Sequence, residues 1–419
     1  MHAKKKKILY LIRAEADFER VVALAIAGKD KFRQVFVFTG DSSPFFSNGI
    51  CSRFQKRLFR EHGFRMKDFC DYDIIGAILK KLSLKRKVFP IEILRSVRSD
   101  KKLFIPMIFL FILKGYIKFR NQKIAKRILK KINPDVFLTD QSQTMEDYTP
   151  EVFRRTALEM GIPSCIFTHG AAGGLHRAFT NPEYNPYKHY YVFACSDMET
   201  NPDYPNRIIL GDMCSSFPYV NYLQSINSHT LSFLSDRKFK ITFIQSGVSN
   251  YYTSTNSWSV MEEIIINLSD NPDVAMVIKK HPRRGVVGYF RMISTFNNVK
   301  IVGPWCDRSR VVKWADIVVC SDHCSAIFEP MILGKKVVAI EGKHIPKYRD
   351  KHSPLKHSSV KHISSAREFD LTSIPNANPE DPVTNRICWG NHRRVDLTKL
   401  FLEKVEEITK SARLCRRSI

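Results

Sequence analysis

The chain has 419 residues, a hydrophobic content of 44% and a formal net charge of +26. This length predicts two or three domains, each with a full hydrophobic core. The ten cysteines have no regular spacing, which argues against a disulfide framework and favours a reducing cytosol. The first 131 residues hold 32 Lys and Arg against 11 Asp and Glu, so most of the positive charge lies in the first third. This charge implies a polyanionic partner: nucleic acid, an anionic membrane surface or an acidic glycan.

The chain opens with a β-α-β pattern. Residues 7–12 predict an apolar strand, and residues 13–27 predict a turn and a helix that carry Glu15 and Asp17. Residues 34–38 predict the second strand. This order begins a doubly wound α/β domain. The glycine fingerprint of a dinucleotide site is absent, so we do not expect NAD binding.

Residues 53–131 predict a basic helical insertion in this first domain. They hold 23 Lys and Arg and 6 Asp and Glu, interleaved with Phe, Leu and Ile. The most apolar piece, 103–113, is too short to span a bilayer, which needs about 20 residues. Flanked by basic residues, it fits an interfacial helix at an anionic membrane surface; a buried helix pair with a solvated basic face is the alternative. No nucleic-acid motif is present, so nucleic acid is not an expected partner.

The alternation of strands and helices resumes at residue 133. A strand at 136–139 delivers Asp140 at its carboxyl end, and a later strand delivers His169. The elements predicted here are a helix at 149–160 and strands at 164–168, 191–194 and 207–210. Residues 1–214 therefore form the first domain, and residues 215–239 read as a polar, poorly periodic linker.

The second domain is predicted at 240–395 and contains two candidate anion sites. A strand at 274–278 ends in a run of basic residues that begins at Lys279, and ligands bind at this edge of open α/β sheets. A strand at 316–320, a polar turn and a helix at 326–333 offer free backbone N–H groups to a phosphate. Within that helix, the Glu329 carboxylate is placed to accept hydrogen bonds from ribose hydroxyls.

The remaining elements of the second domain flank these sites. A strand at 240–244 leads into a loop with Ser246 and Gly247, where glycine lets the backbone approach a phosphate; a plain tight turn is the alternative. A strand at 336–340 follows the Glu329 helix. The histidines after residue 342 lack metal-ligand spacing, so we expect no metal site, and residues 396–419 predict an amphipathic terminal helix.

These motifs resemble the C-terminal domain of GT-B glycosyltransferases, in which two Rossmann-like domains face each other across a cleft. The resemblance rests on the His281-Pro282 pair, the Ser-rich turn, the Glu329 helix and the Gly-Lys-Lys-Val-Val strand. It is nearest to bacterial capsule and lipopolysaccharide enzymes that use CMP-sialic acid or CMP-Kdo, and to CDP-glycerol glycerophosphotransferases. It implies a nucleotide-sugar donor as substrate, with no resident cofactor, and a cell-surface or lipid-linked glycan as acceptor.

The resemblance also implies roles for individual residues. It assigns His281, Ser321, Ser325 and Glu329 to the donor nucleotide. The whole predicted donor site comprises Ser246, Gly247, Lys279, Lys280, His281, Pro282, Arg283, Ser321, Asp322, Ser325 and Glu329. The catalytic base should come from the first domain, where the candidates are Glu15, Asp17, Asp140 and His169. We expect a cytoplasmic enzyme, peripheral at the inner membrane.

Two other classes fit parts of the pattern. Residues 133–174 also resemble the non-hydrolysing UDP-GlcNAc 2-epimerases, which share this fold and the His-Pro motif. The turn at 321–325 reads Ser-Asp-His-Cys-Ser, however, and not the glycine-containing turn of those enzymes. A non-enzymatic glycan- or RNA-binding protein is the third possibility, and the intact donor motifs argue against it.

Overall fold

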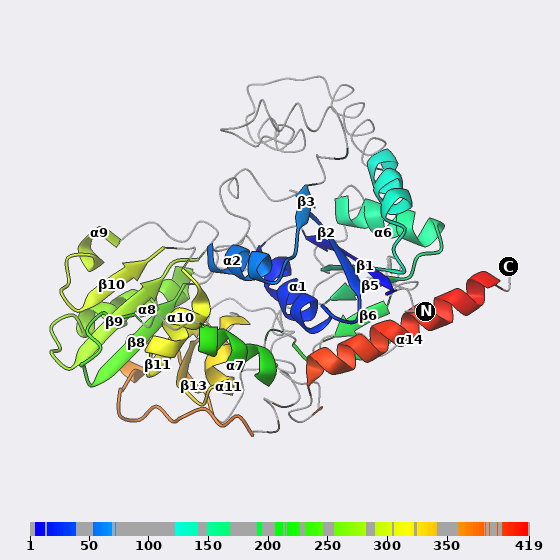
Figure 1. Cartoon of the computed structure of the whole chain (residues 1–419). Coiled ribbons are helices and arrows are strands. Elements are labelled where there is room, and N and C mark those ends of the chain that lie inside the picture. Colours follow the sequence, from blue (N-terminus) through cyan, green and yellow to red (C-terminus); the bar gives the residue numbers. More distant parts are fainter. Residues whose placement is uncertain are drawn as a thin grey trace, which may run out of the picture.

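The structure is a computed structural model built around two parallel β-sheets, each flanked by helices (Figure 1). It describes residues 5–12, 15–38, 53–68, 72, 122–140, 149–167, 191–194, 206–212, 214, 216–226, 231–245, 255–281, 290–303, 306–321, 325–341, 359–380, 382, 385, 392 and 396–417. Both sheets are doubly wound, as the alternating pattern predicts.

The first sheet has seven parallel strands in the order β3-β2-β1-β4-β5-β6-β7. Their bounds are β1 Lys7–Ile12, β2 Arg33–Phe38, β3 Met66–Asp68, β4 Val136–Asp140, β5 Ser164–Phe167, β6 Tyr191–Ala194 and β7 Arg207–Ile209. In β1, Ile8 and Tyr10 enter one hydrophobic cluster, whereas Leu9 and Leu11 enter another. Because successive side chains point to opposite faces, this central strand is covered on both sides and reads as a continuous apolar run.

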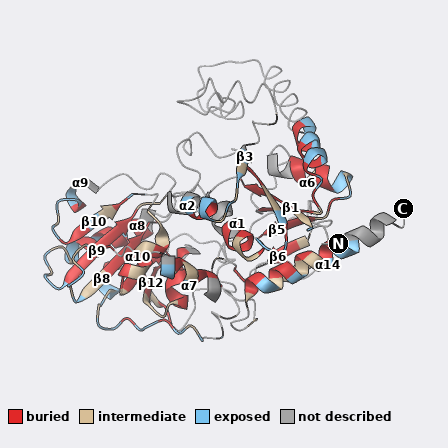
Figure 2. Ribbon diagram, viewed as in Figure 1, coloured by how far each residue is buried: buried red, intermediate tan, exposed pale blue. Residues whose placement is uncertain are grey.

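The second sheet has six parallel strands in the order β10-β9-β8-β11-β12-β13. Their bounds are β8 Phe239–Ile244, β9 Val274–Lys279, β10 Val299–Val302, β11 Ile317–Ser321, β12 Lys336–Ile340 and β13 Lys361–Ile363. In β9 the side chains again divide by face: Ala275 and Val277 join one cluster, and Met276 and Ile278 the other. The long β-branched runs of the sequence are therefore the buried central strands (Figure 2).

Helices cover both sheets. They are α1 Glu15–Ala27, α2 Arg53–Glu61, a helix at 122–132, α6 Thr149–Glu159, α7 Phe217–Ile226, α8 Thr255–Asn267, α9 Phe290–Ile293, α10 Arg308–Trp314, α11 Phe328–Ile332 and α14 Leu397–Arg417. One hydrophobic cluster runs from the first sheet to the second, since it contains both Tyr10 and Val318. The two sheets therefore share apolar packing.

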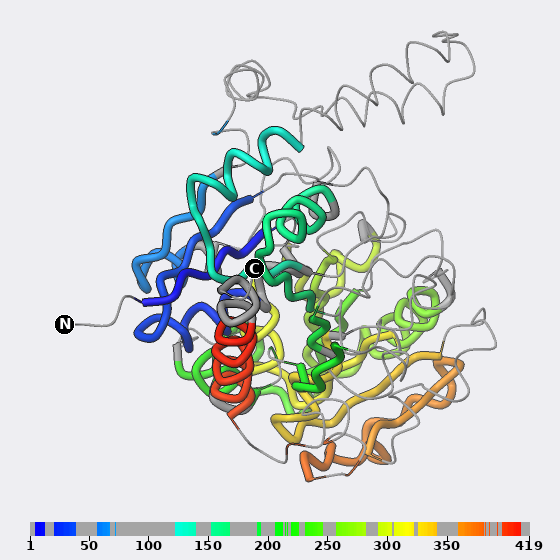
Figure 3. The backbone as a smooth tube through the Cα atoms, turned by 90° about the vertical axis from the view of Figure 1, so that its right-hand side faces the viewer, coloured from blue at the N-terminus to red at the C-terminus, as the bar shows by residue number. Residues whose placement is uncertain are grey.

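The last helix, α14, leaves the second domain and packs on the first. Figure 3 shows it beside the N-terminal elements, and the Phe401 ring lies 5.6 Å from that of Phe167 and 5.2 Å from that of Phe193. The Lys6 ammonium donates to the Glu406 carbonyl at 3.2 Å, which ties β1 to the same helix. The terminal helix thus completes the core of the first domain.

Two stretches differ from the sequence predictions. The polar linker predicted at 215–239 contains a regular helix, α7, whose Tyr219, Val220 and Leu223 are buried at helical spacing. Pro218 obscures this pattern, yet proline is tolerated in the first turn of a helix because the N–H there has no intrahelical acceptor.

The start of the predicted insertion belongs to the first sheet itself. Strand β3 pairs with β2, and the rings of Phe59 and Phe64 lie 4.7 and 5.3 Å from that of Phe36. The apolar piece at 103–113 lies outside the described residues. Across the described part of the chain, every helix is too short or too polar to cross a bilayer.

Candidate functional site

The predicted anion site lies at the carboxyl edge of the second sheet, where β8, β9 and β10 end side by side. The Gln245 N–H donates to the Lys279 carbonyl at 3.1 Å, and the Lys280 N–H donates to the Val302 carbonyl at 3.2 Å. The Gln245 side-chain oxygen accepts from the His281 N–H at 3.3 Å. These bonds fix the backbone of three consecutive residues, the row Lys279, Lys280 and His281, at the point where β9 leaves the sheet.

Gln245 itself contributes an unsatisfied donor to this row. Its side chain is buried, with 3% of its surface exposed, and its Oε1 is occupied by the His281 N–H. Among the described residues its Nε2 group has no hydrogen-bond partner. A buried donor without an acceptor costs about 1–3 kcal/mol, so this amide is a natural contact for an acceptor atom of a ligand.

Further cations surround the loop that follows β10. Burial raises the pKa of the Cys306 thiol and the Asp307 carboxylate raises it further, while the charges of Lys279, Arg310 and Lys300 lower it. The loop therefore has charged groups of both signs near it, and the cations outnumber the carboxylate. Positive charge beside low-dielectric protein attracts an anion.

The Ser-rich turn follows β11. Ser321 is the last residue of the strand rather than the first of the turn, and it pairs in register with Ile340 of β12. A 3₁₀ turn, η5 Ser325–Ile327, then leads into α11. The predicted helix at 326–333 is therefore a 3₁₀ turn followed by a short α-helix, and both begin at the same carboxyl edge as His281.

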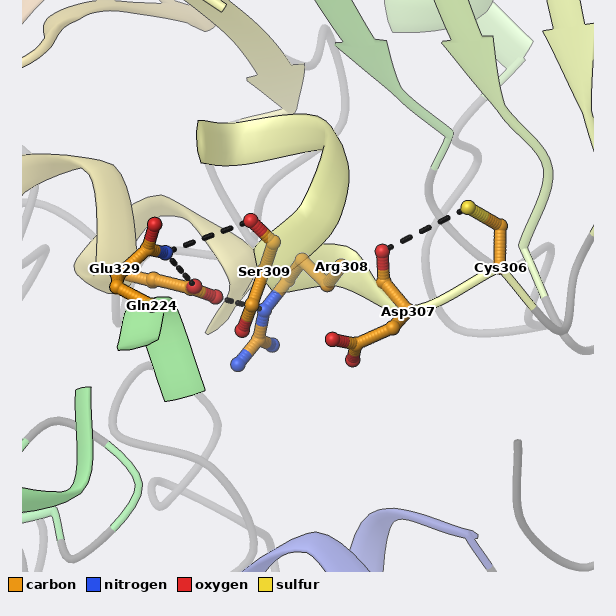
Figure 4. A network of polar contacts seen from close by, with 6 residues as sticks. All are labelled: Gln224, Cys306, Asp307, Arg308, Ser309 and Glu329. Carbon is orange, nitrogen blue, oxygen red and sulfur yellow. Dashed lines mark hydrogen bonds and ion pairs between the residues drawn. The ribbon is translucent and has the colours of Figure 1, made fainter. Parts of the chain in front are cut away.

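Glu329 lies inside a polar network near the start of α10 (Figure 4). Its carboxylate is 2% exposed, and its Oε2 accepts from the Arg308 Nε at 2.9 Å. Its Oε1 accepts from the Gln224 Nε2 at 3.3 Å, and the same amide lies 3.4 Å from the Ser309 carbonyl. A carboxylate offers about four lone-pair sites, so each oxygen keeps acceptor capacity for one more donor.

Helix α7 links this network to the first domain. The Lys313 ammonium donates to the Gln224 carbonyl at 2.7 Å, which fixes α7 to α10. Two residues earlier, the Tyr222 hydroxyl lies 2.8 Å from the His62 Nε2 at the end of α2. Burial lowers the pKa of His62, and the charge of Lys29 lowers it further. The charge of Glu61 acts in the opposite direction. The contact between Tyr222 and His62 joins α7 to the first domain.

The candidate bases of the first domain fall at the matching edge of the first sheet. Asp140 ends β4, and β4 pairs with β1, after which Glu15 and Asp17 lie in the first turn of α1. The structure describes the backbone alone at these three positions and at Ser325. Six predicted site residues lie outside the described ones: His169, Ser246, Gly247, Pro282, Arg283 and Asp322.

Sequence reasoning missed three residues of this region. Arg308 and Gln224 bind Glu329, and Gln245 supplies the unpaired amide. Gln245 opens the predicted loop that contains Ser246 and Gly247, so its position at a strand end was the available signal. No sequence signal pointed to Gln224, because the segment that forms its helix was predicted to be a linker.

Comparisons with known proteins bear on the fold. No family model matches the sequence, and no curated protein matches it. A UDP-N-acetylglucosamine 2-epimerase structure from Listeria monocytogenes, described as putative, superposes with a TM-score of 0.59 at 11% identity, covering 97% of each chain. The Neisseria meningitidis UDP-GlcNAc 2-epimerase bound to UDP-GlcNAc gives 0.53 at 10% identity, covering 96% of this chain and 100% of that one.

A glycosyltransferase is among the similar structures too. The glycotransferase of kitacinnamycin has a TM-score of 0.51 at 13% identity, and 99% of each chain is covered. These neighbours have the GT-B fold. The present chain therefore has the GT-B fold as well, with two parallel-sheet α/β domains in the part of the chain that the structure describes.

The buried ion pair gives a prediction about stability. Arg308→Met leaves the Glu329 carboxylate buried without its cation, which should lower the free energy of unfolding by about 3 kcal/mol. Lys240→Met is the matched control, because the Lys240–Asp316 pair is partly exposed, at 25% and 42%, and should be worth less than about 1 kcal/mol. Urea unfolding of the two variants measures the difference; equal losses would contradict a special role for the Glu329 network.

Proposed function

We propose that this protein is a glycosyltransferase that binds the nucleotide of its sugar donor at the carboxyl edge of the second sheet. The observation that carries the proposal is the row of Lys279, Lys280 and His281 beside the buried Gln245 amide, whose Nε2 has no hydrogen-bond partner among the described residues. This arrangement occurs in a GT-B fold, and solved proteins of that fold bind UDP and UDP-GlcNAc. Cations and a free amide donor are the groups that a nucleotide phosphate requires.

Transfer of a sugar leaves negative charge on the departing nucleotide phosphate. The cations at the end of β9 and the first turn after β11 stabilise that charge, which grows as the glycosidic bond breaks. The Glu329 carboxylate, oriented by Arg308 and Gln224, keeps acceptor capacity for the hydroxyls of a ribose. Asp140, Glu15, Asp17 and His169 are the candidates for the base that removes the proton of the acceptor hydroxyl.

The donor is proposed to be a CMP-sugar, such as CMP-sialic acid or CMP-Kdo, because the His-Pro motif and Ser turn resemble the enzymes that use them. The acceptor follows from the same resemblance: a capsule polysaccharide, a lipopolysaccharide or another lipid-linked glycan. A lipid-linked acceptor would place the enzyme at the cytoplasmic face of the inner membrane. CDP-glycerol in place of the sugar donor is a variant of the same chemistry.

A sugar-nucleotide epimerase is the second candidate. The Listeria epimerase structure has the TM-score of 0.59, above the 0.51 of the glycosyltransferase. The turn at 321–325, which lacks the glycine of those epimerases, and the cationic first third of the chain favour the transferase instead. Both candidates use the same nucleotide site, so they differ in what happens to the sugar.

Nucleotide binding is tested first. CMP, CDP, UDP and GDP should be compared by thermal shift, since a ligand of the native state raises the melting temperature. His281→Ala and Gln245→Met should each weaken the best nucleotide by about 1.5–3 kcal/mol, the worth of a charge-assisted hydrogen bond. His362→Ala, at the far side of the sheet on β13, is the control and should leave affinity unchanged. Unaltered affinity in both site variants would refute this placement of the nucleotide.

The fate of the donor separates the two candidates. A transferase should release CMP or UDP from its donor, and an acceptor glycan should accelerate the release. An epimerase should instead convert UDP-GlcNAc to its C2 epimer without any acceptor and without net release of UDP. Chromatography of reactions with CMP-sialic acid, CMP-Kdo, CDP-glycerol and UDP-GlcNAc measures both the released nucleotide and the epimer. Epimer formation from UDP-GlcNAc alone would overturn the transferase assignment.

We further propose that the reaction needs no metal, since cations of the chain itself can stabilise the leaving phosphate. Treatment with EDTA should therefore leave the rate of nucleotide release unchanged. The measurement is that rate before and after chelation, with Mg²⁺ and Mn²⁺ added back as the control. A loss on chelation that either ion restores would contradict the proposal.

A further inference from the structure

The helix at 122–132 carries a surface of one charge sign. All five of its charged residues are basic and exposed, and they are Lys123, Lys126, Arg127, Lys130 and Lys131. We call these five residues the cationic face. Their spacing of three and four residues places them along one stripe of the helix. In Figure 2 this helix, beside α6, carries pale-blue exposed residues and red buried ones.

The opposite side of the same helix is fixed to the first domain. Ile124, Ala125, Ile128, Leu129 and Ile132 are all buried, and they share a hydrophobic cluster with Phe137 of β4 and Phe153 of α6. On the exposed side of the helix, the Arg127 guanidinium donates to the Tyr72 carbonyl at 3.2 Å. The Lys131 ammonium lies 6.0 Å from the centre of the Tyr72 ring. The cationic face is therefore presented by a rigid support.

This charge pattern works against the stability of the helix. Three pairs of like charge stand four residues apart, the first being Lys123 and Arg127, and each such pair costs a few tenths of a kcal/mol. Helix α14 shows the usual solution for a solvated face, because its Lys404 pairs with Glu407 at 2.8 Å. The helix at 122–132 contains no acidic residue of its own, so its like-charge pairs are not interrupted within the helix. An approaching anionic surface reduces the repulsion within these pairs.

We propose that the cationic face docks on an anionic lipid bilayer. Four of its five cations are lysines, whose point charges suit attraction to a charged surface better than the bidentate recognition typical of arginine. Among the described residues one aromatic ring, that of Tyr72, lies beside the face, 6.0 Å from the Lys131 ammonium. A single ring does not make the series of stacking platforms that single-stranded nucleic acid uses, so a planar partner fits the face better than RNA. The charges run from Lys123 to Lys131, which at 1.5 Å per residue is a stripe of about 12 Å along the helix.

The sequence upstream of the helix agrees with this partner. Residues 101–132 hold ten basic residues and no acidic one, and the apolar run at 103–113 lies within that interval. The inference concerns the helix alone and does not depend on nucleotide binding. It adds to the proposed function a means by which an enzyme with a lipid-linked acceptor remains at the acceptor's surface.

Vesicle flotation tests the inference. The full chain should float with vesicles of phosphatidylcholine and phosphatidylglycerol, and not with phosphatidylcholine alone. Binding should weaken as salt rises, because salt screens exposed charges. Each basic residue near an anionic surface contributes about a fivefold gain in partition. The triple variant K123E/K126E/K130E should therefore partition onto the anionic vesicles at least about 100-fold more weakly than the wild type.

The matched control is K31E/K399E/K410E, which changes the net charge equally at exposed positions on other elements, the turn between α1 and β2 and the helix α14. It should lose far less binding than the first variant. Lysine-to-glutamine versions of both serve if charge reversal impairs folding, and the thermal shift with CMP and UDP shows that the nucleotide site survives. No flotation of the wild type at low salt would overturn the inference, and so would equal losses in the two variants. Loss of RNA binding with unchanged flotation would assign the face to nucleic acid instead.

Discussion

Parallel pairing of buried strands is the constraint on which the rest of the structure depends. Every strand of the two described sheets pairs in parallel with its neighbours, so within each sheet all carboxyl ends meet at one edge. Polar residues that are distant in sequence, such as Gln245, His281 and Ser321, are brought together there without any further device. The same rule collects Asp140 and the start of α1 at the edge of the first sheet.

Burial of the apolar strands offsets the unfavourable free energy of the polar groups at the sheet edges. A row of neighbouring cations and a buried amide without a partner are both unfavourable, and they persist because β8, β9 and β11 are buried along nearly their whole length. The Glu329–Arg308 pair follows the same logic, since its desolvation is tolerated only with Gln224 completing the hydrogen bonding. Stability thus resides in the sheets, and binding capacity resides at their ends.

The sequence predicted the central strands well, because runs such as 274–278 are β-branched, apolar and bounded by charge. It did not predict elements whose position is set by tertiary packing. Strand β3 is three residues long, and its place beside β2 depends on aromatic contacts made by Phe59 and Phe64. Helix α7 was missed because one proline hid its period. The Glu329 position was found by motif, but its partners Arg308 and Gln224 come from distant segments that no local pattern connects.

The packing of α14 has a consequence for how the chain folds as it is synthesised. Phe401 and Leu402 cover apolar surface of the first domain, yet the whole of the second domain lies between them and β5 in the sequence. The first domain therefore leaves the ribosome with one hydrophobic face uncovered and must wait for the final segment to close it. Until α14 is synthesised, that face can bind chaperones or aggregate. Folding of the first domain is therefore complete only after the last helix has been made.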